Sequence, residues 1–254
     1  MTAEALFDFY SDEVVSDFSL LPTTAFVAAI RGYSDATIGR LFERRLPSRA
    51  SDLFVGGGDI DVAVAKSRED LRRAEELVRH QYAARGYFAD TEHPQEAMRS
   101  ASRRASVIVA RSHGRAVGTL TVVIDSPAGL FADEVNQDFI EPLRAEGRRL
   151  GEFVRLAVTH QRDTDSREVL AALFNAAVGI CVANRLDALL IEVNPRHVGF
   201  YRRALCFEVA GTEKVCPRVN APSVLLRMSL ADLTRKIGSL ERAISEFPLG
   251  PNTD

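Results

Sequence analysis

Residues 191–208 read Ile-Glu-Val-Asn-Pro-Arg-His-Val-Gly-Phe-Tyr-Arg-Arg-Ala-Leu-Cys-Phe-Glu, and this stretch is the most informative about the fold. An apolar run typical of a buried strand covers residues 186–193 and ends at Asn194. Pro195 follows where a helix can begin, because the first helical position needs no backbone N–H. The segment therefore predicts a buried strand that leads directly into a short helix carrying Tyr201.

Outward from this segment, strand-like and helix-like patterns alternate along the chain. Strands are predicted over residues 60–65, 106–111, 116–125, 149–158, 186–193, 207–215 and 223–229, and helices over 67–85, 132–146, 166–184, 195–204 and 230–244. Ser67 has the position of an N-cap, and Ser-His-Gly between the second and third strands favours an antiparallel hairpin. This order of elements predicts a mixed α/β (α+β) sheet flanked by helices.

Three glycines at residues 56–58 divide the chain. They precede a predicted strand instead of following one, so they do not match a nucleotide-binding fingerprint. We interpret them as a flexible joint. We predict an N-terminal helical extension over residues 1–58, one α/β domain over 59–230, and a C-terminal helix and tail over 231–254.

Composition excludes several classes of function. The chain has 254 residues, with 32 basic and 35 acidic side chains, a net charge of −3 that argues against a general nucleic-acid binder. The three cysteines lack a CxxC pair and the five histidines lack a metal-binding spacing, so we expect no disulfide framework and no metal. The longest nearly apolar run, residues 170–183, is too short to cross a bilayer. Residues 1–20 lack the basic start of a secretory signal, and we expect a cytoplasmic protein without stable membrane insertion.

The spacing of Asn194 and Tyr201, followed by Cys206-Phe207 where Gly-Phe is usual, resembles the signature of the GNAT-type N-acyltransferase superfamily. Five motifs then occur in a fixed order: residues 80–87 (HQYAARGY), 118–120 (GTL), 152–158 (EFVRLAV), 194–197 (NPRH) and 219–222 (VNAP). Together they resemble the long-chain N-acyl amino acid synthases, a GNAT branch related to the acyl-homoserine lactone synthases. Exosortase-associated acyltransferases share part of the pattern.

The resemblance implies a GNAT-like fold with a twisted, mostly antiparallel sheet. It also implies an N-acyltransferase that moves a fatty acyl group, expected to be long, from a thioester to the α-amine of an amino acid by direct attack. Two alternatives stay open. One is a coenzyme A-dependent N-acetyltransferase of the same fold, and the other is a non-catalytic GNAT-like module that binds an acyl ligand or a partner.

Acyl transfer to an amine requires a proton acceptor, stabilisation of the oxyanion and a donor to the leaving thiolate. The resemblance implies Glu152 as the proton acceptor, with Glu192 as the second candidate, and Tyr201 as the donor to sulfur. It also implies that Asn194 flanks the pantetheine arm. His197 is expected to be structural, since a helix N-terminus disfavours its cationic form. A base must be ionised, so we expect Glu152→Gln to cost more activity at low pH than Glu192→Gln.

A bulge is usual in the corresponding GNAT strand, and it is expected to bring Glu152 and Arg155 to one side. The same bulge implies that backbone N–H groups near Leu156 and Ala157 turn toward the thioester carbonyl. Arg155 and Arg79 are candidates to bind the carboxylate of the amino acid, because a guanidinium matches a carboxylate with two hydrogen bonds. A surface salt bridge for Glu152 and a solvated helix face for Arg79 remain alternatives.

The absence of a phosphate-binding motif indicates which acyl donor to expect. GNAT enzymes that use coenzyme A carry two small residues in a phosphate-binding loop, and residues 162–167 have Asp165 and Arg167 at those positions. An aspartate repels a pyrophosphate, so we expect the acyl donor to be a phosphopantetheine thioester without a nucleotide. We expect acyl carrier protein to be the partner that carries it, and no bound cofactor. Five arginines are candidates to meet this acidic carrier: Arg162, Arg167, Arg196, Arg202 and Arg203. A solvated run of charge is the alternative.

Overall fold

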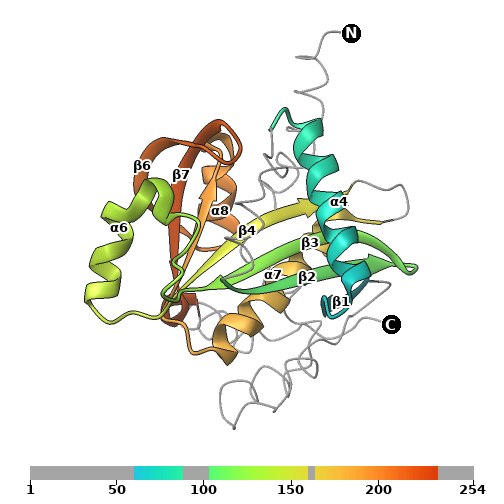
Figure 1. The fold of residues 1–254 in the computed structure, drawn as a ribbon, viewed down its shortest axis with the longest axis horizontal. Coiled ribbons are helices and arrows are strands. Elements are labelled where there is room, and N and C mark those ends of the chain that lie inside the picture. Colours follow the sequence, from blue (N-terminus) through green and yellow to red (C-terminus); the bar gives the residue numbers. More distant parts are fainter. Residues whose placement is uncertain (1–59, 88–102, 160–163, 234–254) are drawn as a thin grey trace, which may run out of the picture.

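The computed structural model describes residues 60–87, 103–159 and 164–233, which form a seven-stranded sheet with helices on both faces (Figure 1). The strands are β1 (Ile60–Val64), β2 (Arg104–Ser112), β3 (Arg115–Ile124), β4 (Leu150–Val158), β5 (Ala188–Val193), β6 (Glu208–Cys216) and β7 (Ala221–Ser229). The helices are α4 (Arg68–Ala84), α6 (Asp133–Ala145), α7 (Ser166–Ala183), the 3₁₀ helix η2 (Pro195–His197) and α8 (Val198–Ala204). The predicted elements within these ranges are confirmed, with ends that shift by two residues at most.

The extension predicted over residues 1–58 lies outside the described residues. Of the last predicted helix, over residues 230–244, the described part is 230–233, and it is helical.

Strand order in the sheet is β1-β2-β3-β4-β5-β7-β6, and only the β4–β5 pair is parallel. The expected mixed, mostly antiparallel sheet is therefore confirmed. Pairing between β4 and β5 ends at Phe153 and Ile191, although β4 runs on to Val158 beside β3. The two central strands thus separate at their carboxyl ends.

Helices α7 and α8 cover one face of the sheet, and α4 and α6 cover the other (Figure 1). Gly118 of β3 allows α7 to pack this closely, because a Cβ atom there would lie 2.6 Å from Val169 Cγ1 and 2.9 Å from Leu173 Cδ1. The other face is filled by a second apolar cluster under α6 that includes Leu150 and Leu190. The separating ends of β4 and β5 lie between these two cores.

The start of α4 follows from local sequence. The Ser67 hydroxyl accepts a hydrogen bond from the backbone N–H of Asp70 at 3.0 Å, as expected for an N-cap. Ala74 and Val78 are buried against the sheet, whereas Leu71 is 46% exposed. The stripe of α4 that packs on the sheet therefore begins about one turn after Leu71.

Cys206 occupies a left-handed backbone conformation with φ of 59°, directly after α8. The N–H groups of Leu205 and Phe207 both donate to the Tyr201 carbonyl, at 3.1 and 3.2 Å, which closes the helix end. A residue with a Cβ atom is strained in this conformation and glycine is not, which explains why Gly-Phe is usual in the signature.

We expect Cys206→Gly to raise the free energy of unfolding by about 1 kcal/mol, because the strain of a left-handed L-residue is removed. Equilibrium urea unfolding measures this change. Gly114→Ala is the matched control: Gly114 has φ of 75° with nothing near its Cβ position, and alanine there should lower stability by a similar amount. A Cys206→Gly protein no more stable than the wild type would show that Cys206 is unstrained.

Candidate active site

Glu152 lies in the middle of the sheet and is fully buried. Its Oε2 atom accepts hydrogen bonds from the backbone N–H groups of Phe131 at 2.6 Å and Ala132 at 3.2 Å. Its Oε1 atom has no hydrogen-bond partner within the described ranges. Burial raises the pKa of Glu152 to about 8, with the Arg218 guanidinium opposing the shift and the Glu192 carboxylate adding to it. A carboxyl group that titrates near neutral pH suits general base catalysis.

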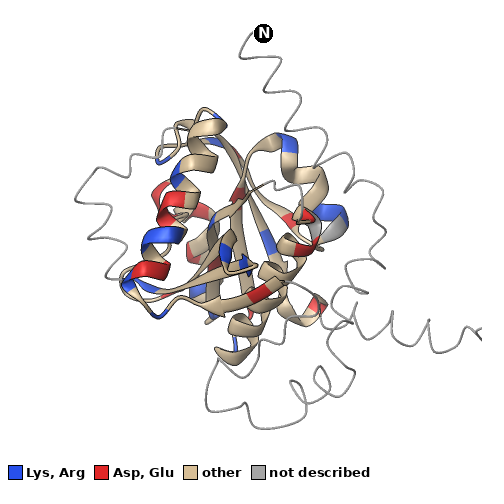
Figure 2. Cartoon of the chain, turned by 90° about the vertical axis from the view of Figure 1, so that its right-hand side faces the viewer, with Lys and Arg blue, Asp and Glu red and all other residues tan. Residues whose placement is uncertain are grey.

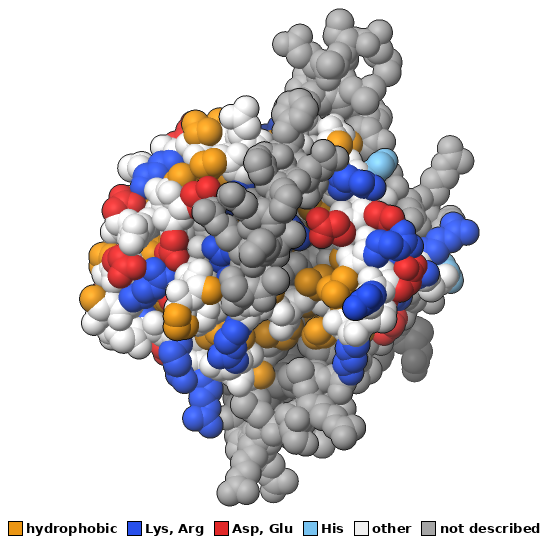
Figure 3. All heavy atoms as spheres, in the orientation of Figure 1, with side chains coloured by type: hydrophobic (Ala, Val, Ile, Leu, Met, Phe, Trp, Pro, Cys, Tyr) orange, Lys and Arg blue, Asp and Glu red, His pale blue; other side chains and the backbone are white. Residues whose placement is uncertain are grey.

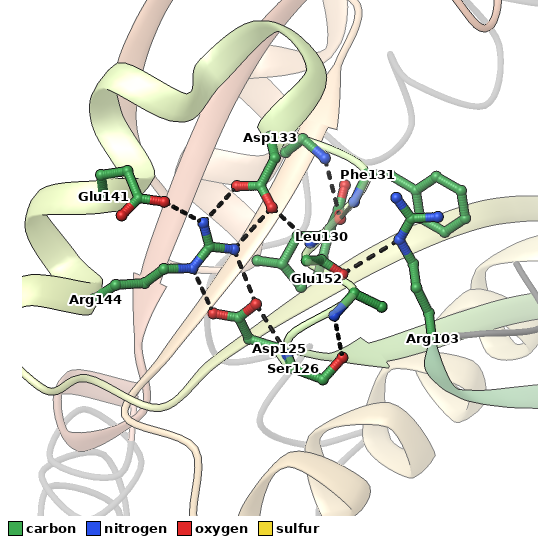
Figure 4. A network of polar contacts seen from close by, with 12 residues as sticks. Arg103, Asp125, Ser126, Leu130, Phe131, Asp133, Glu141, Arg144 and Glu152 are labelled. Carbon is green, nitrogen blue, oxygen red and sulfur yellow. Dashed lines mark hydrogen bonds and ion pairs between the residues drawn. The ribbon is translucent and has the colours of Figure 1, made fainter. Parts of the chain in front are cut away.

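The connection between β3 and α6 holds the two N–H donors over Glu152, and Arg144 holds that connection (Figure 4). Its guanidinium forms two hydrogen bonds with Asp125, at 2.7 and 2.8 Å, and two with Asp133, at 2.9 and 2.8 Å. Asp133 also accepts the Leu130 N–H at 2.7 Å. Paired two-point contacts of this kind fix geometry, so the donors to Glu152 are pre-organised.

Glu192, the second predicted carboxylate, is joined to two residues that the sequence did not indicate. Asn136 Nδ2 donates to its Oε1 at 2.8 Å, and the Arg218 guanidinium forms an ion pair with its Oε2. Arg218 also donates to the Phe131 carbonyl at 2.7 Å and pairs with Glu134 at 2.8 Å. The cluster therefore gathers side chains from β5, from α6 and from the β6–β7 turn.

Both predicted carboxylates lie on the same face of the sheet. Glu152 pairs with Leu190 of the parallel strand, and Glu192 is two residues further along that strand, so its side chain emerges on the same side. Both therefore face α6. The two candidate bases, Glu152 and Glu192, therefore belong to one buried cluster of side chains.

The expected bulge in β4 is present. Thr119 pairs with Ala157 and Thr121 pairs with Val154, so β4 has one residue more than β3 in this interval. Arg155 in the bulge has φ of 55°. A bulge redirects the side chains and N–H groups that follow it, and here it lies where β4 has already parted from β5.

Arg155 reaches toward α4, where its guanidinium pairs with Glu75 at 3.2 Å. Arg79 lies one turn further along α4 with its side chain exposed. Leu156 and Ala157 follow the bulge directly, the first partly buried and the second 3% exposed. The structure thus places the predicted oxyanion and carboxylate ligands around one end of β4, with Arg155 already bound by a carboxylate of the protein.

Tyr201 of α8 is buried among aromatic rings on the α7 side of the sheet. Its ring packs edge-to-face on Phe174, Phe200 and Phe207, with centroids 6.3, 5.2 and 5.9 Å away. Burial raises its pKa above the ordinary value of 10, so the hydroxyl keeps its proton at neutral pH. Tyr201 and Glu152 therefore lie on opposite faces of the sheet, and Glu152 lies one residue before the last β4–β5 pair.

The polar residues after β5 hold one another in place. Asn194 Oδ1 accepts the Arg196 N–H at 3.2 Å and so caps η2. The Arg196 guanidinium donates to His197 Nε2 at 3.2 Å and to the Tyr87 hydroxyl at 3.1 Å. Burial, together with the charges of Arg196 and Arg85, lowers the pKa of His197 to about 4. His197 is therefore neutral at physiological pH.

The remaining predicted arginines are surface residues where the structure describes them. Arg202 and Arg203 are exposed on α8. Arg162 and the side chain of Arg167 lie outside the described part of the chain. In the described part of the chain, basic and acidic residues are interspersed along the helices in Figure 2 and over the visible described surface in Figure 3.

Two further features lie apart from this cluster. A pocket of about 510 Å³ opens between α4 and the β2–β3 turn, lined by Leu77, Gly114 and Thr159 among others, and none of the predicted site residues lines it. Within residues 60–87, 103–159 and 164–233, no three His, Cys, Asp or Glu side chains come together as metal ligands would.

Comparison with known proteins identifies the family. The model of the FeeM family, described as N-acyl amino acid synthase FeeM, matches residues 73–229, more than half of the chain. The chain belongs to the FeeM family. It is an N-acyltransferase with a GNAT fold, and the segment shared with FeeM spans α4 to the end of β7, including Glu152, Glu192 and Tyr201.

Three solved structures are similar to this chain. FeeM itself, an N-acyl amino acid synthase from uncultured soil microbes, is 24% identical and superimposes with a TM-score of 0.62 over 68% of this chain and 91% of its own. The acyl-homoserine lactone (AHL) synthase LasI is 16% identical, with a TM-score of 0.48 over 67% and 90% of the two chains. An acyl-CoA N-acyltransferase from Pseudomonas aeruginosa is 13% identical, with a TM-score of 0.45 over 67% and 99%. No curated protein matches the sequence significantly.

The described helices of this FeeM-family chain include none with the length and apolar character needed to cross a membrane.

Proposed function

We propose that this enzyme transfers a long-chain fatty acyl group from the thioester of acyl carrier protein to the α-amine of an amino acid. Membership of the N-acyl amino acid synthase family gives the reaction class. The observation that supports the mechanism most strongly is Glu152, a fully buried carboxyl group whose pKa is raised to about 8 beside the separation of β4 and β5. Perturbed carboxyl groups of this kind concentrate at catalytic sites.

In this mechanism the thioester lies where β4 and β5 part. Glu152 accepts the proton of the attacking amine, directly or through water, and N–H groups after the Arg155 bulge, at Leu156 and Ala157, stabilise the oxyanion. Tyr201 donates a hydrogen bond to the departing sulfur from the opposite face. No acyl-enzyme is needed.

The cysteines support direct attack. Burial raises the pKa of Cys181 to about 12 and raises that of Cys216 as well, so both thiols stay protonated at neutral pH. A neutral, buried thiol is a poor nucleophile.

The start of α7 supports a donor without a nucleotide. A pyrophosphate would bind at this helix N-terminus, where N–H groups and the helix dipole attract anions. Asp165 directly precedes the helix and Glu168 lies in its first turn. These carboxylates already compensate the dipole and repel a second anion, which favours the phosphopantetheine of acyl carrier protein over coenzyme A.

The test presents the same acyl chain on acyl carrier protein and on coenzyme A, with an amino acid acceptor and chains of increasing length. We expect kcat/KM to be higher with the carrier protein, to fall as salt is added and to rise with chain length. Arg202→Glu/Arg203→Glu should lower the carrier-protein value about tenfold, because reversed charges repel an acidic carrier.

Arg68→Glu/Arg148→Glu is the control, with two exposed arginines reversed at the far end of α4 and before β4. It should leave kcat/KM close to the wild-type value. Equal or better use of acyl-coenzyme A, insensitive to Arg202 and Arg203, would contradict the proposed donor. A preference for short chains would contradict the proposed substrate.

A further inference from the structure

We propose that Arg218 and Glu192 together set the proton affinity of Glu152, and that Arg218 is a positioning residue for the base. The inference rests on the proposed function where it concerns catalysis. The effect on Glu152 itself is a property of the folded protein and can be measured without substrate.

Arg218 is linked to Glu152 through one intervening residue. Its guanidinium donates to the carbonyl of Phe131 at 2.7 Å, and the N–H of Phe131 donates to Glu152 at 2.6 Å. The Arg103 guanidinium lies 4.2 Å from the centre of the Phe131 ring. Phe131, whose N–H binds Glu152, is thus held by its carbonyl and by its ring. Loss of Arg218 removes the contact to the carbonyl.

The buried charges do not balance. Glu152 is fully buried, and the Glu192 and Arg218 side chains are 7% and 17% exposed. The guanidinium forms a direct ion pair with Glu192, so a second buried anion at Glu152 would have no directly paired cation among the residues that the structure describes. Glu152 is therefore the member of the group that holds a proton most readily.

Two buried oxygen atoms without hydrogen-bond partners support a protonated Glu152. Glu152 Oε1 and Asn136 Oδ1 are both buried without a hydrogen-bond partner in the described part of the chain. An ionised Glu152 would leave two buried acceptors without a donor, which costs free energy. A proton on Oε1 converts one of these acceptors into a donor.

The titratable and charged groups near Glu152 and its partners come from several elements. Glu192 of β5 and Arg218 of the β6–β7 turn act on Glu152 itself. Glu134 of α6 pairs with Arg218, Cys216 of β6 lies near Arg218 and Glu192, and Arg103, just before β2, lies over the Phe131 ring. Burial raises the pKa of Cys216, so that group stays neutral near pH 8. Burial raises the pKa of Glu152 to about 8, so its charge changes near neutral pH.

The two partners of the Arg218–Glu192 ion pair should act on Glu152 in opposite directions. Glu192→Gln removes a negative charge, so it lowers the pH at which Glu152 releases its proton. Arg218→Gln removes a positive charge and raises that pH. Each shift should be about one pH unit, since both charges are largely buried and act on the same carboxyl group. A merely structural ion pair would give the same response when either partner is removed.

The experiment is an NMR titration of the free protein labelled with ¹³C at the glutamate side-chain carboxyls. Glu152→Gln identifies the Glu152 signal by its absence. We expect a midpoint near 8 in the wild type, a lower one in Glu192→Gln and a higher one in Arg218→Gln. Arg218→Lys keeps the charge and should stay near the wild-type midpoint, and Arg218→Gln/Glu192→Gln should return toward it.

Shifts in the same direction, or no shift, would overturn the inference. If Arg218→Gln does not fold, Glu192→Gln and Arg218→Lys still decide it, because the first must lower the midpoint and the second must preserve it. The pH dependence of kcat/KM in the same variants is the second readout. Midpoints that move while the activity profile does not would leave the electrostatic inference standing and would reject Glu152 as the base.

Discussion

Glu152→Gln should lower kcat/KM by about 10²- to 10⁴-fold at pH 9, the usual range for loss of a general base, and far less at pH 6. The reason is the raised pKa of about 8, caused first by burial. Below that pH the wild-type carboxyl is mostly protonated and is as unable to accept a proton as the amide is. The expectation that Glu152→Gln costs more activity at low pH than Glu192→Gln stays a prediction, and the raised pKa of Glu152 moves the pH range in which its own loss is felt upward.

The measurement is the ratio of wild-type to Glu152→Gln kcat/KM across pH. Ionisation of the acceptor amine affects both proteins equally, so it cancels. The ratio should rise roughly 50-fold between pH 6 and 8 and level off above, as the ionised fraction of one group does. A ratio independent of pH would contradict the assignment of Glu152.

The folding free energy supplies a check that needs no catalysis. The folded pKa of Glu152 lies near 8 and its ordinary value is 4.5. Between these values the folded protein holds a proton that the unfolded chain has released. The contribution to stability is complete below about 4.5 and is lost as pH rises to about 8, at a rate of about 1.4 kcal/mol per pH unit. Glu152→Gln should lack this decline in urea unfolding over the same window.

Tyr201→Phe should lower kcat about 10- to 100-fold with little change in the KM for the donor. Burial raises the pKa of this hydroxyl further above that of a thiol, so full proton transfer to the sulfur is unfavourable. A hydrogen bond to the thiolate remains, and bonds to charged groups contribute about 1.5–3 kcal/mol. Steady-state kinetics with a saturating acceptor measures the effect.

Phenylalanine fits the space among Phe174, Phe200 and Phe207, so stability should change little. Tyr82→Phe is the matched control, since burial raises the pKa of Tyr82 to about 12 as well and no role is assigned to it. Equal losses of kcat in both variants, or full activity in Tyr201→Phe, would show that Tyr201 serves only in packing.

Local patterns were enough to predict most of the fold. Alternating apolar residues marked the strands, the Ser67 cap marked the start of α4, and Ser-His-Gly marked the hairpin, where His113 and Gly114 take positive φ of 48° and 75°. These signals act over a few residues, so a single sequence contains them. The bulge at Arg155 came from the family resemblance, because a register shift leaves no local signal.

The site was only partly predictable because its members come from distant segments. Asn136 and Arg218 reach Glu192 across 56 and 26 residues of sequence. Asn136 offered a weak signal, as a buried amide one turn before the buried Ile140 on the same stripe of α6. Arg218 offered none, since an arginine in a turn between two strands is ordinarily solvated. The full burial of Glu152 likewise depends on the β3–α6 connection that covers it.

The proposed activity joins a fatty acyl group to an amino acid. Its most direct test is a reaction of the purified protein with acyl-loaded acyl carrier protein and a mixture of the common amino acids, followed by mass spectrometry. We expect an N-acyl amino acid made from one amino acid or a small set of them, with the amount strongly reduced by Glu152→Gln. Release of free fatty acid alone, or no amide with any amino acid, would contradict it.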